Sequence, residues 1–286
     1  MATSPRCISG TSITGDWLWF VARFTKQTLS AGSRGTSMAK PTSTTLRSAR
    51  ALAEEAFAQP TVSSLSLDVV KADPEVEALI RHANLNLGVL GFTEHGFRHV
   101  NLVSSIARNV LRLLGYDERH QELAAIAGYL HDVGNVVNRH GHALTGAMLA
   151  HGILLRLGMS FDDIAVVMGA IGSHDGDNNR LGEAVHSVSA ALTLADKSDV
   201  HRSRVRNPEP STFDQHDQVN YAATGSFLRV DGEAKTITLE LTIDTDMASV
   251  MQYFEIFLPR MQMCRNAAEM LGCEFHIVMN NELTLL

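Results

Sequence analysis

Apolar residues recur every three or four positions through the middle of the chain, as in Ile106, Val110, Leu113 and Leu114. This spacing places apolar side chains on one face of a helix. It predicts helices at about 46–58, 74–88, 94–114, 118–131, 141–157, 161–173 and 182–196. Gly115 and Gly158 follow two of these segments, as is typical of helix ends. Because no strands alternate with the helices, we predict an all-α bundle.

The pattern changes after residue 206. Asn207-Pro208-Glu209-Pro210 interrupts the helical periodicity. Strands are predicted at 227–230 and 236–241, and the intervening Asp231-Gly232 is a hairpin signal. A helix at 246–271 and a strand at 274–278 follow. The predicted fold class is therefore mainly α, with a small C-terminal α+β subdomain in β-β-α-β order.

The first 45 residues are rich in Ser, Thr, Gly and Arg and show no periodicity, which predicts a disordered extension. Residues 1–52 carry seven basic residues against Asp16 alone. Such a start is similar to a transit peptide. A mis-called start codon, with Met38 as the alternative, is the interpretation that we favour. The predicted domains are the extension at 1–45, the helical metal-binding domain at 46–206 and the subdomain at 207–286.

The composition favours a soluble globular protein and argues against disulfide-rich, membrane-spanning and duplex-binding proteins. A hydrophobic fraction of 45% and a charged fraction of 19% are typical of a soluble globular chain. Three cysteines are too few for a disulfide framework or a thiolate zinc site, which favours a reducing cytoplasm. No apolar run approaches the ~20 residues of a membrane span. The net charge of −7 argues against duplex nucleic acid as a partner but is compatible with small anionic substrates.

The segment Leu130-His131-Asp132-Val133-Gly134 is the most informative part of the chain, because a histidine and an aspartate end a long apolar helix together. An imidazole nitrogen and a carboxylate that can bridge two ions suit a binuclear metal site. Four further candidates lie at or near predicted helix ends, as a metal site in a bundle core requires. They are His95, His142, His174 and Asp196. His99 lies four residues after His95, so either could reach a metal from the same helix face.

The ordered set His95, His131-Asp132, Asp196 resembles the HD superfamily of metal-dependent phosphohydrolases, whose order is H…HD…D. The stretch Glu94-His95-Gly96-Phe97-Arg98 looks like the first-helix signature of that family, and this likeness selects His95 over His99. The additional His142 and His174 resemble the two-metal subgroup that includes the HD-GYP proteins. The resemblance covers roughly residues 80–200.

Three departures separate the chain from HD-GYP proteins. Asn135 stands where that group has Lys, Ser173 stands where it has the first His of a His-His pair, and the Gly-Tyr-Pro motif is missing after Asp175. These departures argue against cyclic di-GMP hydrolysis.

The resemblance implies two divalent transition metal ions, for which Mn, Fe, Ni, Co and Zn all suit the ligands. One would bind His95, His131, Asp132 and Asp196, and the other would bind Asp132, His142 and His174. A metal hydroxide would attack phosphorus. Asp132 would bridge the two ions, and Asp175 would contact the metal-bound water or the leaving group.

A basic run follows Asp196 in this otherwise acidic region. Lys197, Arg202 and Arg206 are candidates for binding substrate phosphate, with Arg202 and Arg206 on one helix face at i, i+4. The alternative for this run is a solvated basic helix face. Arg98 and Asn135 are additional candidates for supporting the metals or the substrate.

The predicted function is hydrolysis of a phosphomonoester, phosphodiester or phosphoanhydride of a small nucleotide-like molecule in the cytoplasm. Two alternatives stay open: a non-catalytic HD signalling or scaffold module, and a di-iron HD oxygenase. The C-terminal subdomain is a candidate for homodimer formation or for sensing a ligand.

Overall fold

The computed structural model describes residues 65–176 and 181–285, all of which belong to one compact unit. The predicted extension at 1–45 and the predicted helix at 46–58 lie outside these described residues. The division into domains therefore stays a prediction. Among the described residues, no helix is both long and apolar enough to cross a membrane.

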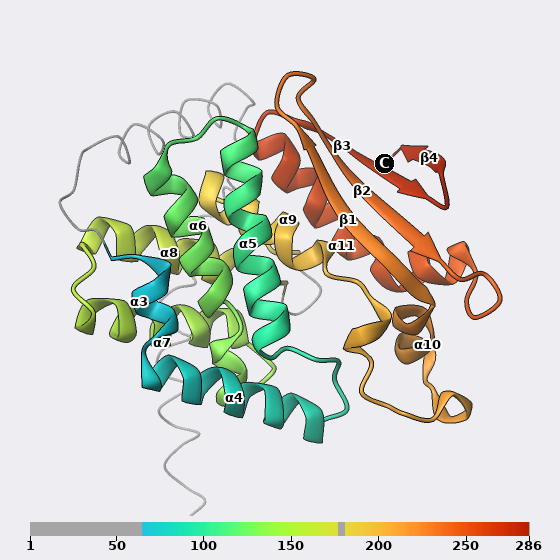
Figure 1. The fold of residues 1–286 in the computed structure, drawn as a ribbon, viewed down its shortest axis with the longest axis horizontal. Coiled ribbons are helices and arrows are strands. Elements are labelled where there is room, and N and C mark those ends of the chain that lie inside the picture. The colour runs from blue at the N-terminus through green and yellow to red at the C-terminus, as the bar shows by residue number, and fades with distance from the viewer. Residues whose placement is uncertain (1–64, 177–180, 286) are drawn as a thin grey trace, which may run out of the picture. The chain divides into compact units, whose positions relative to one another are not determined.

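The N-terminal part of this unit is a helical bundle (Figure 1). Helix α5 packs against α6 and α9, and α7 packs against α8. Every residue of α9 is buried, so this helix forms the centre of the bundle. The helices are α3 (Leu67–Lys71), α4 (Pro74–Val89), α5 (Phe97–Leu113), α6 (Glu118–Leu130), α7 (His142–Arg156), α8 (Phe161–Ser173) and α9 (Ser187–Ser198), with a 3₁₀ turn η1 (Val133–Val136) between α6 and α7.

Two glycines allow the close backbone approaches that shape the bundle. A Cβ on Gly128 would lie 2.8 Å from the Cα of Ser104, so α6 crosses α5 with almost no space between them. A Cβ on Gly134 would overlap the carbonyl oxygen of His142 and would lie 2.5 Å from the amide nitrogen of Gly146. Gly134 does not form a left-handed turn at the end of α6. Its φ is not positive, and its role is instead to let η1 rest against the start of α7.

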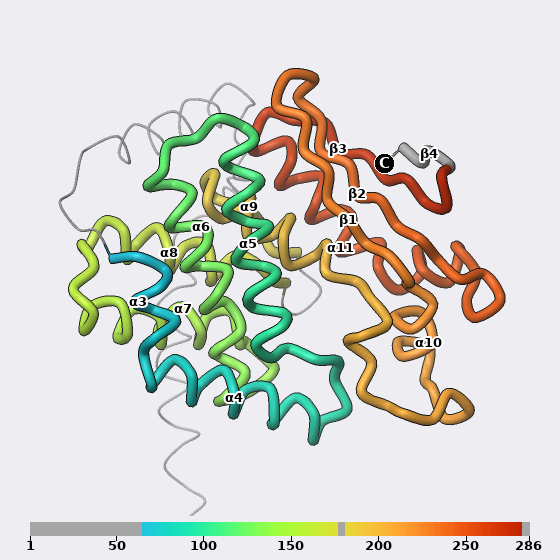
Figure 2. Tube along the Cα trace, viewed as in Figure 1, coloured from blue at the N-terminus to red at the C-terminus, as the bar shows by residue number. Residues whose placement is uncertain are grey.

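The C-terminal part forms a four-stranded sheet with the order β1-β2-β3-β4. Alternate residues of β2 and β3, among them Leu239 and Ile277, are buried. Helix α11 contacts α9 as well as β2 and β3, and therefore joins the sheet to the bundle. Figure 2 traces the chain through α11 and back into β3, which runs parallel to β2. The elements are α10 (Gln215–Ala222), β1 (Ala223–Asp231), β2 (Thr236–Ile243), α11 (Val250–Met270), β3 (Glu274–Met279) and β4 (Glu282–Leu285).

The predicted fold class, a mainly α bundle followed by β-β-α-β, is confirmed. Sequence reasoning missed α3, α10 and β4, which are short. It began three helices too early, because α5 starts at Phe97 after Gly96, α9 starts at Ser187 after His186 and α11 starts at Val250 after Ser249. The predicted helix face at Arg202 and Arg206 is wrong. Residues 202–204 form a single 3₁₀ turn, and the chain is extended from Val205.

Candidate metal centre

Four buried histidines converge where the ends of α6, α7 and α8 meet the first turn of α5. The Nε2 atoms of His99 and His131 are 3.2 Å apart, and those of His142 and His174 are 3.3 Å apart. The rings of His131 and His174 also meet edge to face, with 5.0 Å between their centroids. The four imidazoles therefore form one continuous group.

Each of these rings is oriented by a hydrogen bond from its other nitrogen. The Nδ1–H of His99 donates to Asp199 Oδ2 at 2.6 Å. The Nδ1–H groups of the other three rings each donate to the backbone carbonyl three residues earlier. The distances are 2.8 Å for His131, 3.1 Å for His142 and 2.6 Å for His174. Because carbonyl and carboxylate oxygens only accept, Nδ1 carries the proton and the Nε2 lone pair of the neutral ring points inward. Metal-binding histidines are held in this way.

Two aspartates complete the group. Asp132 Oδ2 lies 3.2 Å from His131 Nε2, and Asp132 Oδ1 lies 3.5 Å from His142 Nε2, so its carboxylate faces both histidine pairs. Asp196 Oδ1 lies 3.3 Å from His99 Nε2. We call this set the metal-ligand cluster. Its members are His99, His131, Asp132, His142, His174 and Asp196.

The donor set fits a metal ion. Asp132 Oδ2 is buried and makes no hydrogen bond to any described residue. That oxygen lies 3.2 Å from His131 Nε2 and 3.5 Å from His99 Nε2, so a cation bound by these imidazoles would also reach it and offset the cost of its burial. Atoms from three ligands at a time lie within 4.8 Å of one another in three overlapping combinations. Imidazole and carboxylate ligands in this number suit Mn, Fe, Ni, Co or Zn.

The surrounding charges affect the two histidine pairs differently. Burial lowers the pKa of His131, but Asp132 and Asp196 outweigh it and raise that pKa to about 10. Burial and the charge of His131 lower the pKa of His174 to about 3. Burial also lowers the pKa of His142. The carboxyl pKa of Asp132 is held well below its usual value by His131, despite burial.

The structure places His95 and His99 in different surroundings. His99 lies in the first turn of α5 inside the cluster, whereas His95 precedes the helix. The His95 Nδ1–H donates to the carbonyl of Thr93 at 2.7 Å, and its ring centroid is 5.3 Å from that of His99. The prediction assumed one helix face for both residues. Because Gly96 caps the helix, His95 instead lines a cavity beside the cluster.

Three other predicted residues lie at the cluster. Asn135 donates from Nδ2 to Asp132 Oδ1 at 2.8 Å, which orients that carboxylate. Lys197 is buried, and its Nζ is 2.8 Å from Asp196 Oδ2 and 3.0 Å from Asp175 Oδ1. Asp175 Oδ2 lies 3.7 Å from His142 Nε2. Despite burial, Lys197 lowers the pKa of Asp175, so this carboxylate is ionised at neutral pH.

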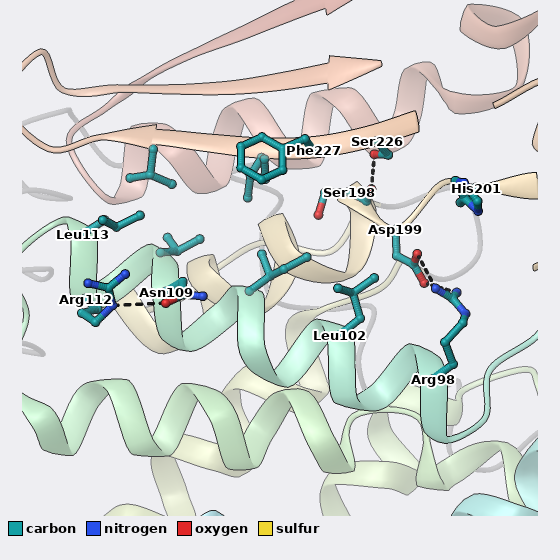
Figure 3. Close-up of a pocket in the computed structure, with 14 residues that line it drawn as sticks. Arg98, Leu102, Asn109, Arg112, Leu113, Ser198, Asp199, His201, Ser226 and Phe227 are labelled. Carbon is teal, nitrogen blue, oxygen red and sulfur yellow. Dashed lines mark hydrogen bonds and ion pairs between the residues drawn. The ribbon is translucent and has the colours of Figure 1, made fainter. Parts of the chain in front are cut away.

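Arg98, a predicted substrate-binding residue, faces away from the cluster. Figure 3 shows its guanidinium directed at Asp199, and the Nη2 to Oδ2 distance is 2.8 Å. The pair lines a cavity of about 450 Å³ between α5 and β1. Arg98 therefore fixes Asp199, which in turn fixes His99. Asp199 was not predicted, because only the folded chain brings it 2.6 Å from a histidine a hundred positions earlier.

The other two predicted arginines also lie outside the cluster. Arg206 donates to the carbonyl oxygens of Phe92 and Asn84. Arg202 stacks over Tyr221, 4.9 Å from the ring centroid, and its Nη2 is 3.5 Å from Asp244 Oδ2. Without a helix at 202–206, they have no common face.

Comparison with known proteins agrees with this geometry. A model of the HD domain family matches residues 96–200. This segment is an HD domain. The match confirms the predicted superfamily, and it includes His99 but starts after His95. The two-metal subgroup stays a prediction.

Two known proteins are similar to larger parts of the chain. The Methanocaldococcus jannaschii protein named "Uncharacterized protein MJ1020" is 24% identical over 218 residues, which are 68% of this chain and 82% of that protein. The crystal structure of a predicted HD superfamily hydrolase from an uncultured Thermotogales bacterium shares 24% sequence identity and covers 47% of this chain and 73% of its own. The TM-score is 0.35.

Proposed function

We propose that the protein is a metal-dependent phosphohydrolase that cleaves a phosphate ester or anhydride of a small molecule at a two-metal centre. One observation supports this most strongly. Four buried imidazoles have their Nδ1 atoms engaged in hydrogen bonds and direct their Nε2 atoms at the carboxylates of Asp132 and Asp196. This arrangement prepares donors for cations, because no described residue hydrogen-bonds the buried Asp132 Oδ2.

The cluster divides into two overlapping ligand groups. His99, His131, Asp132 and Asp196 would hold one ion, and Asp132, His142 and His174 would hold the other. When bound, two such ions lower the pKa of a bridging water and stabilise charge on a phosphoryl group. The shared Asp132 fixes the spacing of the two groups, and Asn135 fixes the orientation of Asp132.

Lys197 and Asp175 form an ion pair beside the cluster. Lys197 is 3% exposed and pairs with both Asp196 and Asp175, which limits the repulsion between these carboxylates. Asp175 is ionised at neutral pH, so it can accept a proton or a hydrogen bond but has none to donate. We therefore propose that Asp175 orients the attacking water or accepts its proton.

The experiment compares the wild type with Asp132→Asn, an isosteric change that removes the shared charge. Metal content is measured by mass spectrometry on anaerobically purified protein, beside phosphate release from a panel of phosphate esters and anhydrides. We expect about two metal ions per wild-type chain. The variant should lose metal, and its phosphate release should fall by at least ~10³-fold, because both ligand groups need Asp132. Asp246→Asn, on an exposed turn, is the control that should change neither.

The other outcomes would each assign a different function. A wild type that binds no metal after reconstitution would exclude a two-metal hydrolase and would favour a non-catalytic module. Two iron ions with turnover that depends on oxygen would favour an HD oxygenase.

A further inference from the structure

A cavity of about 350 Å³ adjoins the metal-ligand cluster, and both parts of the chain build it. His95 and Arg139 line it from the bundle, while α10 and α11 line it from the C-terminal part. Arg139 connects this cavity to the cluster, because its Nη1 lies 3.2 Å from His142 Nε2 and its Nη2 lies 3.3 Å from Asp175 Oδ2. A molecule in the cavity would therefore contact Arg139, which in turn contacts His142 and Asp175.

Three guanidinium groups line this cavity: Arg139, Arg204 and Arg260. Arg204 is 2% exposed and donates to the carbonyls of Glu94 and Asp199, but its Nη2 has no hydrogen-bond partner among the described residues. Arg260 lies over the ring of Phe257, 5.1 Å from the centroid, and no carboxylate of the described residues forms an ion pair with it.

Arg139 Nη2 lies 3.3 Å from Asp175 Oδ2 and Arg204 Nε lies 3.6 Å from Asp199 Oδ2, so these two cations each have a carboxylate near them, whereas Arg260 adds a positive charge without such a partner among the described residues. The positive charge of Arg260 disfavours the charged forms of Lys197 and Arg204, and so acts to lower the pKa of each. Burial is the main reason that the pKa of Arg204 is lowered, and Arg260 adds to this effect. In a chain of net charge −7, a concentration of positive charge beside a metal site favours an anionic ligand. Guanidinium groups bind phosphate oxygens in well-defined geometry.

The opposite wall has different chemistry. Asp214, Asp217 and Asn220 come from α10 and the residue before it, and they supply carboxylate and amide oxygens. Such acceptors suit a molecule that carries several hydroxyl groups. The volume lies near the lower end of the ~300–1,000 Å³ that is typical of small-molecule sites. The cavity therefore suits a compact ligand rather than a dinucleotide.

We propose that this cavity is the substrate site and that it selects the phosphate monoester of a compact polyhydroxylated molecule. Arg139, Arg204 and Arg260 would bind the phosphate, and Asp214 and Asp217 would bind the hydroxyl groups. This inference rests on the proposed phosphohydrolase function and adds its substrate class.

The first test measures phosphate binding without catalysis. Inorganic phosphate is titrated by calorimetry into protein whose metals have been removed by chelation, so that protein side chains alone contribute. We expect Arg260→Gln to weaken binding about tenfold, because a charge-assisted hydrogen bond is lost. Arg260→Lys should keep part of the affinity. Arg265→Gln is the control, because Arg265 is five positions further along α11 and faces another direction.

The second test separates the two walls with two probes, ribose 5-phosphate and phenyl phosphate, on metal-loaded protein. We expect Asp217→Asn to raise the KM for ribose 5-phosphate several-fold and to leave phenyl phosphate unchanged, since only the first probe carries hydroxyl groups. Equal effects on the two probes, or wild-type phosphate affinity in Arg260→Gln, would overturn the inference. If these variants behave as expected for binding but no ester is cleaved, the proposed function fails while the ligand site stands.

Discussion

The metal-ligand cluster contains two histidine pairs: the first pair is His99 and His131, and the second pair is His142 and His174. The two pairs have similar geometry but different surroundings. His99 donates to the carboxylate of Asp199, and both rings of its pair lie within 3.6 Å of Asp196 Oδ1. His142 and His174 donate only to backbone carbonyls, and the guanidinium of Arg139 lies 3.2 Å from His142 Nε2. Carboxylates therefore dominate the surroundings of the first pair, whereas the second pair lies near the positive charges of Arg139 and Lys197 as well as near Asp132 and Asp175.

This difference determines where the cluster holds protons before metal binds. The raised pKa of His131, about 10, keeps a proton in the first pair at neutral pH. The lowered pKa values of His142 and of His174, the latter about 3, keep the second pair neutral. A cation entering the first pair must displace a proton, but a cation entering the second pair need not. Similar ligands can thus form two sites that differ in affinity and in pH dependence.

The largest effect should come from Gly134→Ala, which would break the second pair. The new methyl group would overlap the His142 carbonyl and force η1 away from α7. Since His142 is the first residue of α7, its ring would move out of reach of Asp132. We expect metal content to fall from about two ions per chain to about one. The unfolding free energy should fall by about 1–3 kcal/mol, and phosphate release should be abolished.

Gly152→Ala is the matched control for this prediction. Gly152 lies in α7, the helix that begins with His142, but nothing is near the position of its Cβ, so alanine there should stabilise α7 by up to ~1 kcal/mol and keep both ions. Two ions in Gly134→Ala would show that η1 and α7 do not position His142.

The sequence predicted those members of the cluster that lie at or near helix ends. His131, Asp132, His142, His174 and Asp196 all end or begin helices whose apolar spacing is clear, and the fold brings them together. The choice of His95 over His99 rested on likeness to a family signature, whereas the structure brings His99 into the cluster and leaves His95 before α5, which starts at Phe97 after Gly96. The arginines of the cavity were missed, because Arg139 and Arg260 line the same cavity only through the packing of α11 against the bundle. Periodicity along one segment carries no information on such contacts.

The second-largest effect should be the pH dependence of metal affinity. It tests whether the two histidine pairs differ in their protonation before metal binds. Below a pKa of about 10, His131 must lose its proton to bind a metal, so affinity at the first pair should rise about tenfold per pH unit, or ~100-fold from pH 6 to pH 8. His174, with a pKa of about 3, is already neutral in this range, so affinity at the second pair should barely change. Calorimetric metal titrations in buffers of different ionisation enthalpy would count the protons released. One proton for each ion, or none for either, would contradict the difference between the pairs.

The smallest effect should come from Asp199→Asn, which changes only the support of the first pair. Asparagine can still accept the Nδ1–H of His99 but loses the charge that favours its basicity and the ion pair with Arg98. Loss of such a supporting carboxylate typically lowers metal affinity about 10- to 100-fold. We expect that loss at the first pair only, measured by competition with a chelator. Asp163→Asn breaks another buried aspartate–arginine pair, that with Arg119, and should reduce stability without changing metal affinity. If both variants lose affinity equally, the effect of Asp199 is on folding and not on His99.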